Sequence, residues 1–170
     1  TITIAFIPRT FFGVICNDAL SSDNPSCGYI DETGFLYESA PWASGSLIMK
    51  IRTDFSDVKA GVTVIDQATI RQMIFLNKEV PRMTGLRISA YELKSHAPDE
   101  LRFTATDGFE DHPKIIGDGL RVIMKKSGDP SVTLRVLATV LTEEIKARQK
   151  EVDYIDLRFG NKVFYKLKQR

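Results

Sequence analysis

In the first third of the chain, apolar and polar residues alternate, which is the pattern of β-strands with one buried face. Ile2, Ile4 and Phe6 alternate with smaller or polar neighbours and predict an opening strand over residues 2–9. Short apolar runs predict further strands over residues 11–16, 28–38 and 47–53. The run over residues 28–38 breaks at Asp-Glu-Thr-Gly, and glycine supplies the positive φ of a tight turn, so this run is expected to be a β-hairpin.

Two later segments change to a helical period. Asp66 is a plausible N-cap of the first, and the apolar stripe that follows comprises Ile70, Met73, Ile74 and Val80. The second has Asp129 as its cap and Pro130 at its first helical position. Its apolar residues recur at helical spacing to about residue 149: Leu134, Leu137, Ala138, Leu141 and Ile145.

The remaining segments again have the period of strands. Residues 87–93 and 100–106 alternate like two paired strands, and residues 119–126 predict another. The chain ends in a predicted hairpin, in which Ile155, Leu157 and Phe159 face one way and Gly160-Asn161 makes the turn into a last strand. This order predicts a single α+β domain over residues 1–170, with a mostly antiparallel curved sheet, two helices packed on one face and a C-terminal β-hairpin.

Composition and charge narrow the class of protein. The 170 residues are 43% hydrophobic and 26% charged, which is ordinary for a globular domain. The net charge of +1 gives no reason to expect nucleic acid as a partner. No apolar run approaches the roughly 18 residues that span a membrane. Because the sequence starts without Met inside a strand pattern, we expect a fragment from which a preceding segment, including any membrane anchor, has been removed.

Two cysteines, Cys16 and Cys27, lie eleven positions apart, on either side of the turn-rich stretch of residues 17–26. They either form a disulfide that closes this loop or remain as two buried thiols, and the pattern alone leaves both possibilities open. With no nearby histidine or third cysteine, they do not make a structural zinc site, which needs four ligands.

The best candidate for chemistry lies at residues 106–113, where Asp107, Glu110, Asp111 and His112 gather within six positions. Such a cluster is either a metal or acid–base site of a hydrolase or a solvated turn between strands, and we favour the turn. The sequence has no nucleophile elbow, phosphate-binding glycine loop or zinc-binding histidine pair. We therefore expect no enzymatic activity, no metal and no cofactor.

Two segments resemble a known family. The run Tyr-Ile-Asp-Leu-Arg-Phe-Gly-Asn-Lys-Val at 154–163, after a long amphipathic helix, resembles the end of the β domain of FtsQ/DivIB, the bacterial cell-division protein. The segment at 27–37 resembles the "apolar-Asp-x-x-Gly-x-aromatic" hairpin of that family. The cysteine pair and its loop are not general features of the family. Its POTRA domain, transmembrane helix and cytoplasmic tail would precede Thr1.

The resemblance implies a non-catalytic divisome component that regulates septum formation. Members of this family are single-pass membrane proteins whose β domain lies on the extracytoplasmic face of the bacterial cytoplasmic membrane. There it binds FtsB/DivIC-like and FtsL-like partners, which add a strand at the end of the β domain. The resemblance also favours a disulfide between Cys16 and Cys27.

On this interpretation the last strand is the docking edge, and Arg158 and Phe159 flank the docked segment. Arg158 would act as a charged or hydrogen-bonding contact and Phe159 as apolar surface. The docking residues on the strand itself are Val163, Phe164, Tyr165, Lys166 and Leu167.

Several alternatives remain. Phe159 can instead belong to the core, and the last strand can be covered by a continuation of the chain. The last strand also carries charges that can serve only to keep an edge strand from aggregating, on Lys162, Lys166 and Lys168. A different class of protein, an extracytoplasmic carbohydrate- or peptide-binding module, would use Trp42 and Tyr37 as a stacking platform.

Overall fold

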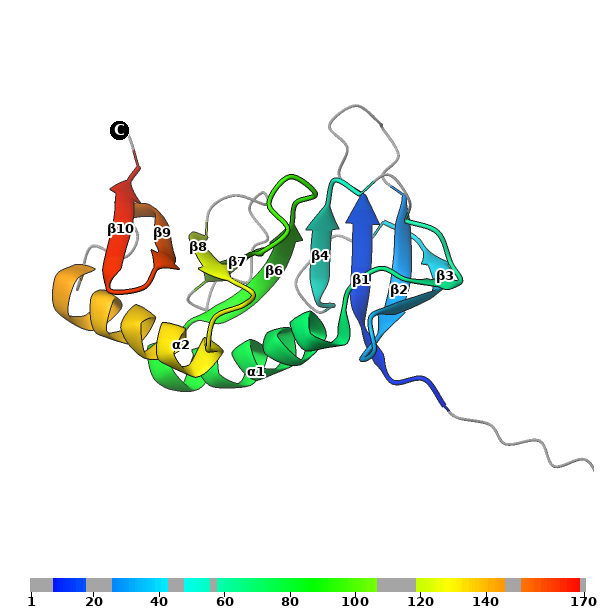
Figure 1. Ribbon diagram of the computed structural model, residues 1–170, viewed down its shortest axis with the longest axis horizontal. Helices are drawn as coiled ribbons and strands as arrows, with labels where there is room; N and C mark the ends of the chain where they lie inside the picture. The colour runs from blue at the N-terminus through cyan, green and yellow to red at the C-terminus, as the bar shows by residue number, and fades with distance from the viewer. Residues whose placement is uncertain are drawn as a thin grey trace, which may run out of the picture.

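The computed structural model describes residues 8–17, 26–42, 48–55, 58–106, 119–145 and 151–168. Ten strands in these ranges form one sheet, and two helices pack against it (Figure 1). The strands of the N-terminal half are β1 (Phe11–Asn17), β2 (Cys27–Asp31), β3 (Phe35–Ala40), β4 (Lys50–Thr53) and β5 (Val62–Thr63). Those of the C-terminal half are β6 (Arg87–Leu93), β7 (Glu100–Thr106), β8 (Leu120–Lys125), β9 (Val152–Phe159) and β10 (Lys162–Leu167).

Neighbours in the sheet follow the order β10-β9-β8-β7-β6-β4-β1-β2-β3-β5. The pairs β1–β4, β4–β6 and β8–β9 are parallel, and the other pairs are antiparallel. The sheet is therefore mostly antiparallel, as the sequence predicts. Gly34 and Gly160 have φ values of 80° and 65°, which only glycine adopts readily, and they close the two predicted hairpins.

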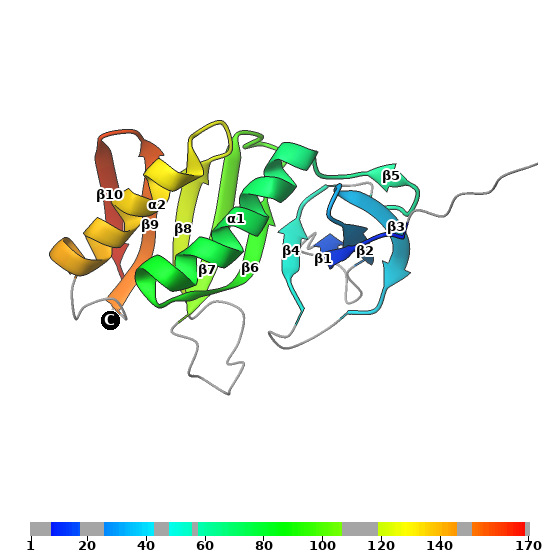
Figure 2. The same ribbon diagram turned by 90° about the horizontal axis from the view of Figure 1, so that it is seen from below.

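Both predicted helices are present and begin at the predicted caps. The Asp66 carboxylate accepts from the Thr69 N–H before α1 (Gln67–Thr84), and the Asp129 carboxylate accepts from the Ser131 N–H before α2 (Pro130–Thr139). The second helix continues as a π-helix, η1 (Val140–Ile145). Its predicted end near residue 149 lies outside the described residues. Figure 2 shows α1 and α2 side by side on one face of the sheet, which confirms the α+β prediction.

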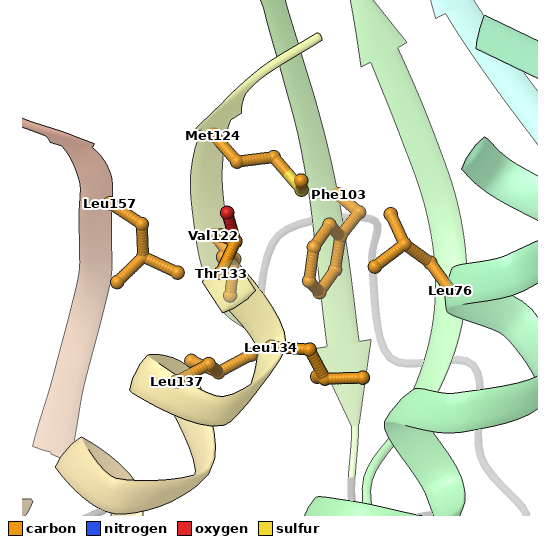
Figure 3. Close-up of a pocket in the computed structure, with 8 residues that line it drawn as sticks. All are labelled: Leu76, Phe103, Val122, Met124, Thr133, Leu134, Leu137 and Leu157. Atoms are coloured by element: carbon orange, nitrogen blue, oxygen red, sulfur yellow. The ribbon is translucent and has the colours of Figure 1, made fainter. Parts of the chain in front are cut away.

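The main core lies between these helices and the sheet. Tyr91 of β6 is fully buried, and its hydroxyl, which has one proton to donate, lies within hydrogen-bond distance of two oxygens on α1, the backbone carbonyl of Met73 and Oδ1 of Asn77. Burial raises the pKa of Tyr91 well above its ordinary value, so the hydroxyl stays protonated and keeps both contacts. Side chains from α1, α2, β7, β8 and β9 close around a small hollow that has no room for a ligand (Figure 3).

Figure 3 also shows how the C-terminal hairpin is attached. Leu157 of β9 points into this hollow toward Leu134 and Leu137 of α2. Ile155, two residues earlier, is fully buried in the same core. These side chains fix β9 in the sheet, and β10 pairs with β9 as the last strand of the sheet.

One local prediction is wrong, and another lies mostly outside the described residues. Ile74 was expected on the apolar stripe of α1, but 38% of it is exposed, while Gln72 is buried. Consecutive helical residues are about 100° apart, so a buried face centred on Met73 and Leu76 turns Ile74 toward solvent. The opening strand predicted over residues 2–9 lies mostly outside the described residues, and residues 8–10 are not in a strand.

Candidate protein-interaction edge

The last strand, β10, lies at one end of the sheet. It pairs antiparallel with β9, where Phe164 lies opposite Asp156 and Lys166 opposite Tyr154. The register shifts between Lys162 and Phe164 and again near the end of the strand. No strand pairs with the outer side of β10 within the described parts of the chain. An edge strand of this kind presents backbone N–H and C=O groups that a strand from another chain can satisfy.

The predicted docking residues of β10 divide into two sets. Val163 and Leu167 are partly buried and pack against the main core, so they anchor the strand. Phe164, Tyr165 and Lys166 are exposed. Phe164 is 50% and Tyr165 47% accessible. Because consecutive strand residues project to opposite faces of a sheet, each face of β10 presents one exposed aromatic side chain, a residue type enriched at interaction surfaces.

Phe159 joins Phe164 in an aromatic surface that crosses the hairpin. It follows the buried residues Ile155 and Leu157 on β9, but 52% of it is exposed. Its ring meets that of Phe164 edge to face, at 83° and with 5.2 Å between centroids. The sequence alternative that places Phe159 in the core is therefore wrong, because the hairpin end extends past the helices that cover Ile155 and Leu157.

Arg158 is held within the sheet by two carboxylates. Its guanidinium pairs with Asp156 on the same strand, where Nη2 lies 2.6 Å from Oδ2, and with Glu100 at the start of β7. Both carboxylates are largely buried, whereas 29% of the Arg158 side chain is exposed. The Arg158 Cζ atom also lies 5.4 Å from the centroid of the Phe159 ring. Arg158 thus supports the aromatic surface, and whether it contacts a partner stays a prediction.

Further ion pairs continue from Glu100 across the face of the sheet that lies opposite the helices. Glu100 also binds Arg102, with Nη2 and Oε2 2.7 Å apart, and Arg102 lies near Glu92 of β6 at 3.8 Å. This row of alternating charges ties β9 to β7 and β6 across the intervening β8. The hairpin is therefore held by ion pairs on one face and by Ile155 and Leu157 on the other.

The edge itself is cationic. Lys162, Lys166 and Lys168 are exposed, and none of them has an ion-pair partner among the described residues. Residues 159–168 contain no acidic side chain. A strand that docks here would meet half-exposed aromatic rings and unpaired ammonium groups.

The cysteine pair lies far from this edge. Cys16 and Cys27 are direct cross-strand neighbours on β1 and β2 and are joined by a disulfide. They pack with Val14 on the sheet face opposite the helices. The disulfide thus fixes the two strands that border the loop between them.

Of the two alternative sites suggested by the sequence, the described residues bear on the aromatic platform alone, and they do not assemble it. Trp42 is 46% exposed, but within the described residues Tyr37 stacks on Tyr29 and has no ring contact with Trp42. The cluster Asp107–His112 lies outside the described residues. Among those described, no group of three or more His, Cys, Asp or Glu residues lies close enough to hold a metal ion. In the same residues, no helix is both long and apolar enough to span a membrane.

Sequence reasoning identified Arg158 but missed its carboxylate partners. Asp156 could have been found, because residues two apart on a strand share a face. Glu100 lies 58 positions earlier and carries no local signal of the contact. Comparison with models of known protein families and with curated protein sequences finds no match to this chain.

Proposed function

We propose that this chain is a non-catalytic interaction domain that binds a partner protein by strand addition along β10, and that it acts in bacterial cell division as an FtsQ/DivIB-type protein. The observation that carries the proposal is the terminal position of β10, with Phe164 and Tyr165 half exposed beside its outer edge.

The hairpin has the physical properties that strand addition needs. Val163 and Leu167 hold β10 against the core, so the edge is formed before the partner arrives and little ordering is required of this chain. Main-chain hydrogen bonds would supply affinity, and pockets for alternate side chains would supply selectivity. The unpaired lysines keep the free edge soluble and discourage pairing with another copy of the same basic strand.

The cell-division assignment depends on the sequence resemblance. The resembling run over residues 154–163 corresponds to β9, its turn and the start of β10, which is the part of the fold that forms the candidate edge. The proposed partners are FtsB/DivIC-like and FtsL-like proteins. The domain would lie on the extracytoplasmic face of the bacterial cytoplasmic membrane, and a transmembrane helix in the full-length protein would anchor it there.

Capture of the extracytoplasmic segment of an FtsB-like protein from the same organism tests the proposal. We expect Tyr165→Pro to abolish capture, since proline distorts the strand and removes a backbone donor. Val62→Pro, on the edge strand at the other end of the sheet, is the matched control and should leave capture unchanged. A melting curve for each variant verifies that the domain remains folded. If the Tyr165→Pro variant is folded and captures the partner segment as well as the wild type does, strand addition at β10 is contradicted.

A further inference from the structure

A second hollow lies at the surface, between the first half of α1 and the turn that leads from β8 into α2. Unlike the hollow in Figure 3, it is open to solvent and has a volume of about 340 Å³. Ligand pockets in proteins have volumes of about 300–1,000 Å³, so this one suits a small ligand or a chain end. We call it the α1–α2 hollow. Its lining includes Arg71, Gln72 and Phe75 of α1, with Lys126 and Pro130 on the other side.

The turn that forms one wall of the α1–α2 hollow is held in place by hydrogen bonds. The Asp99 carboxylate accepts from the N–H and the hydroxyl of Ser127, at 2.9 and 2.8 Å. The Asp99 carbonyl also accepts from the Lys126 N–H, at 2.8 Å. At the end of the turn, the Asp129 carboxylate caps α2. The hollow is therefore formed before a ligand arrives, and binding requires little ordering of this chain.

Gln72 provides a free hydrogen-bond acceptor in the α1–α2 hollow. The residue is only 7% exposed, and its Nε2 donates to the Lys125 carbonyl at 3.4 Å. Its Oε1 has no hydrogen-bond partner in the described part of the chain. Every buried side-chain nitrogen or oxygen there does have a partner, so Gln72 Oε1 is not sealed off and is accessible to solvent. An N–H group of a ligand in the hollow can therefore donate to this oxygen.

The charged side chains that line the α1–α2 hollow are both basic. Arg71 is exposed and Lys126 is partly buried, and neither has an ion pair within the described ranges. Lys126 lies near the carboxylates of Asp66 and Asp99. These two carboxylates are engaged in the α1 cap and in the turn, and they do not line the hollow. The hollow thus presents two cations to an anionic group of a ligand.

We propose that the α1–α2 hollow binds the C-terminal residue of a partner peptide whose last side chain is apolar. The terminal carboxylate pairs with Arg71, whose guanidinium can donate two parallel N–H groups to it, and with Lys126. The N–H of the last residue donates to Gln72 Oε1, and its side chain packs on Phe75 and Pro130. This site is separate from β10 and does not depend on the function proposed above.

The combination of groups in the hollow favours a chain end over an acidic side chain. In a C-terminal residue the carboxylate, the N–H and the side chain are attached to one Cα atom, so one small hollow can bind all three. An internal aspartate or glutamate uses its side chain to carry the carboxylate. It therefore has no apolar side chain left to pack on Phe75 and Pro130.

Fluorescence anisotropy with an N-terminally labelled tetrapeptide that ends in leucine tests the proposal. We expect saturable binding, weakened roughly tenfold when the peptide carboxylate is amidated and also by Arg71→Met or Lys126→Met. Methylation of the last amide nitrogen of the peptide should weaken binding as well, which tests the contact with Gln72 without altering the protein. Lys78→Met, at an exposed lysine on α1 outside the hollow, is the matched control and should bind like the wild type.

The proposal is wrong if no saturable binding occurs at millimolar peptide. It is also wrong if the amidated peptide binds as tightly as the free acid, because the carboxylate is then not recognised. Equal weakening by Lys78→Met and Arg71→Met would reduce the effect to general attraction by surface cations. Unchanged binding of the N-methylated peptide would remove Gln72 from the site, and with it the preference for a chain end. An amidated peptide with an internal aspartate that binds as tightly as the leucine peptide would assign the hollow to acidic side chains instead.

Discussion

The rings of Phe159 and Phe164 meet edge to face, with their centroids 5.2 Å apart, although both side chains are about half exposed. The two residues come from the two strands of the C-terminal hairpin, so the contact closes the end of the hairpin. It also holds both rings in one orientation beside the outer edge of β10, with which no strand of the described residues pairs. A fixed aromatic pair of this kind loses little conformational freedom when a partner covers it.

Alanine substitution of this pair should weaken partner capture more than it weakens the fold. Phe159→Ala and Phe164→Ala each remove a side chain that is half exposed already, so we expect melting temperatures close to that of the wild type. The affinity for the partner segment, measured by calorimetry, should fall in both variants. A double-mutant cycle on binding should give a coupling of about 0.5–1.5 kcal/mol. Unchanged affinity in both variants would exclude the pair from the interface.

The ion pairs of Arg158 should contribute to stability. Arg158→Leu removes the guanidinium from the largely buried carboxylates of Asp156 and Glu100, of which Glu100 keeps its pair with Arg102. We expect it to lower the free energy of unfolding by about 1–3 kcal/mol. Arg82→Leu is the matched control, because Arg82 pairs with Glu79 at a 2.8 Å distance on the exposed side of α1. Arg82→Leu should lower the free energy of unfolding by less than about 1 kcal/mol. If urea unfolding gives the same loss of unfolding free energy for both variants, the ion pairs of Arg158 add no stability beyond that of an exposed pair.

The carboxylate of Asp31 should make stability depend on acid pH. Burial by itself raises the pKa of Asp31, but hydrogen bonds from Thr33, Arg9 and Phe35 outweigh burial and hold the pKa below its ordinary value. Stabilisation by this group is therefore complete above the pKa of the unfolded chain and is lost as the pH falls through the lower folded pKa. The same contacts hold the turn between β2 and β3.

Asp31→Asn tests this dependence. Between about pH 5 and pH 2 the unfolding free energy of the wild type should fall more steeply than that of Asp31→Asn, which has no carboxylate to protonate there. At neutral pH the variant should be the less stable of the two. Parallel pH profiles from urea unfolding would show that Asp31 has the same pKa in the folded and unfolded chains.

The disulfide between Cys16 and Cys27 gives a fourth prediction. Reduction should raise the intact mass by two hydrogen atoms. The double variant Cys16→Ala, Cys27→Ala should unfold at a lower denaturant concentration, with a loss of about 2–3 kcal/mol. Partner capture at β10 should not change, since the disulfide lies on β1 and β2 at the other half of the sheet. An unchanged mass on reduction would contradict the disulfide.

Local signals in the sequence predicted the elements that depend on residues close together in the chain. The caps Asp66 and Asp129 and the strand pair β6–β7 lie where the patterns place them, because capping and alternation depend on near neighbours. The parallel pair β4–β6, by contrast, joins strands separated by α1. The pattern of either strand gives no sign of which neighbour it takes.

The candidate edge was only partly predictable for the same reason. The Gly-Asn turn and the alternating residues indicate a hairpin, but not that β10 is the end of the sheet, which depends on the order of all ten strands. The exposure of Phe159 likewise depends on where α2 lies. The contact between Arg158 and Glu100 joins residues far apart in sequence, so it appears only when the sheet is assembled.

Amide hydrogen exchange with and without the extracytoplasmic segment of the FtsB-like partner tests strand addition at β10. We expect binding to slow exchange in residues 162–168, because amides on the outer edge of β10 become hydrogen bonded. Exchange in β3 and β5, at the opposite end of the sheet, should not change. If the partner segment binds and exchange in residues 162–168 is unaltered, the partner does not add a strand at β10.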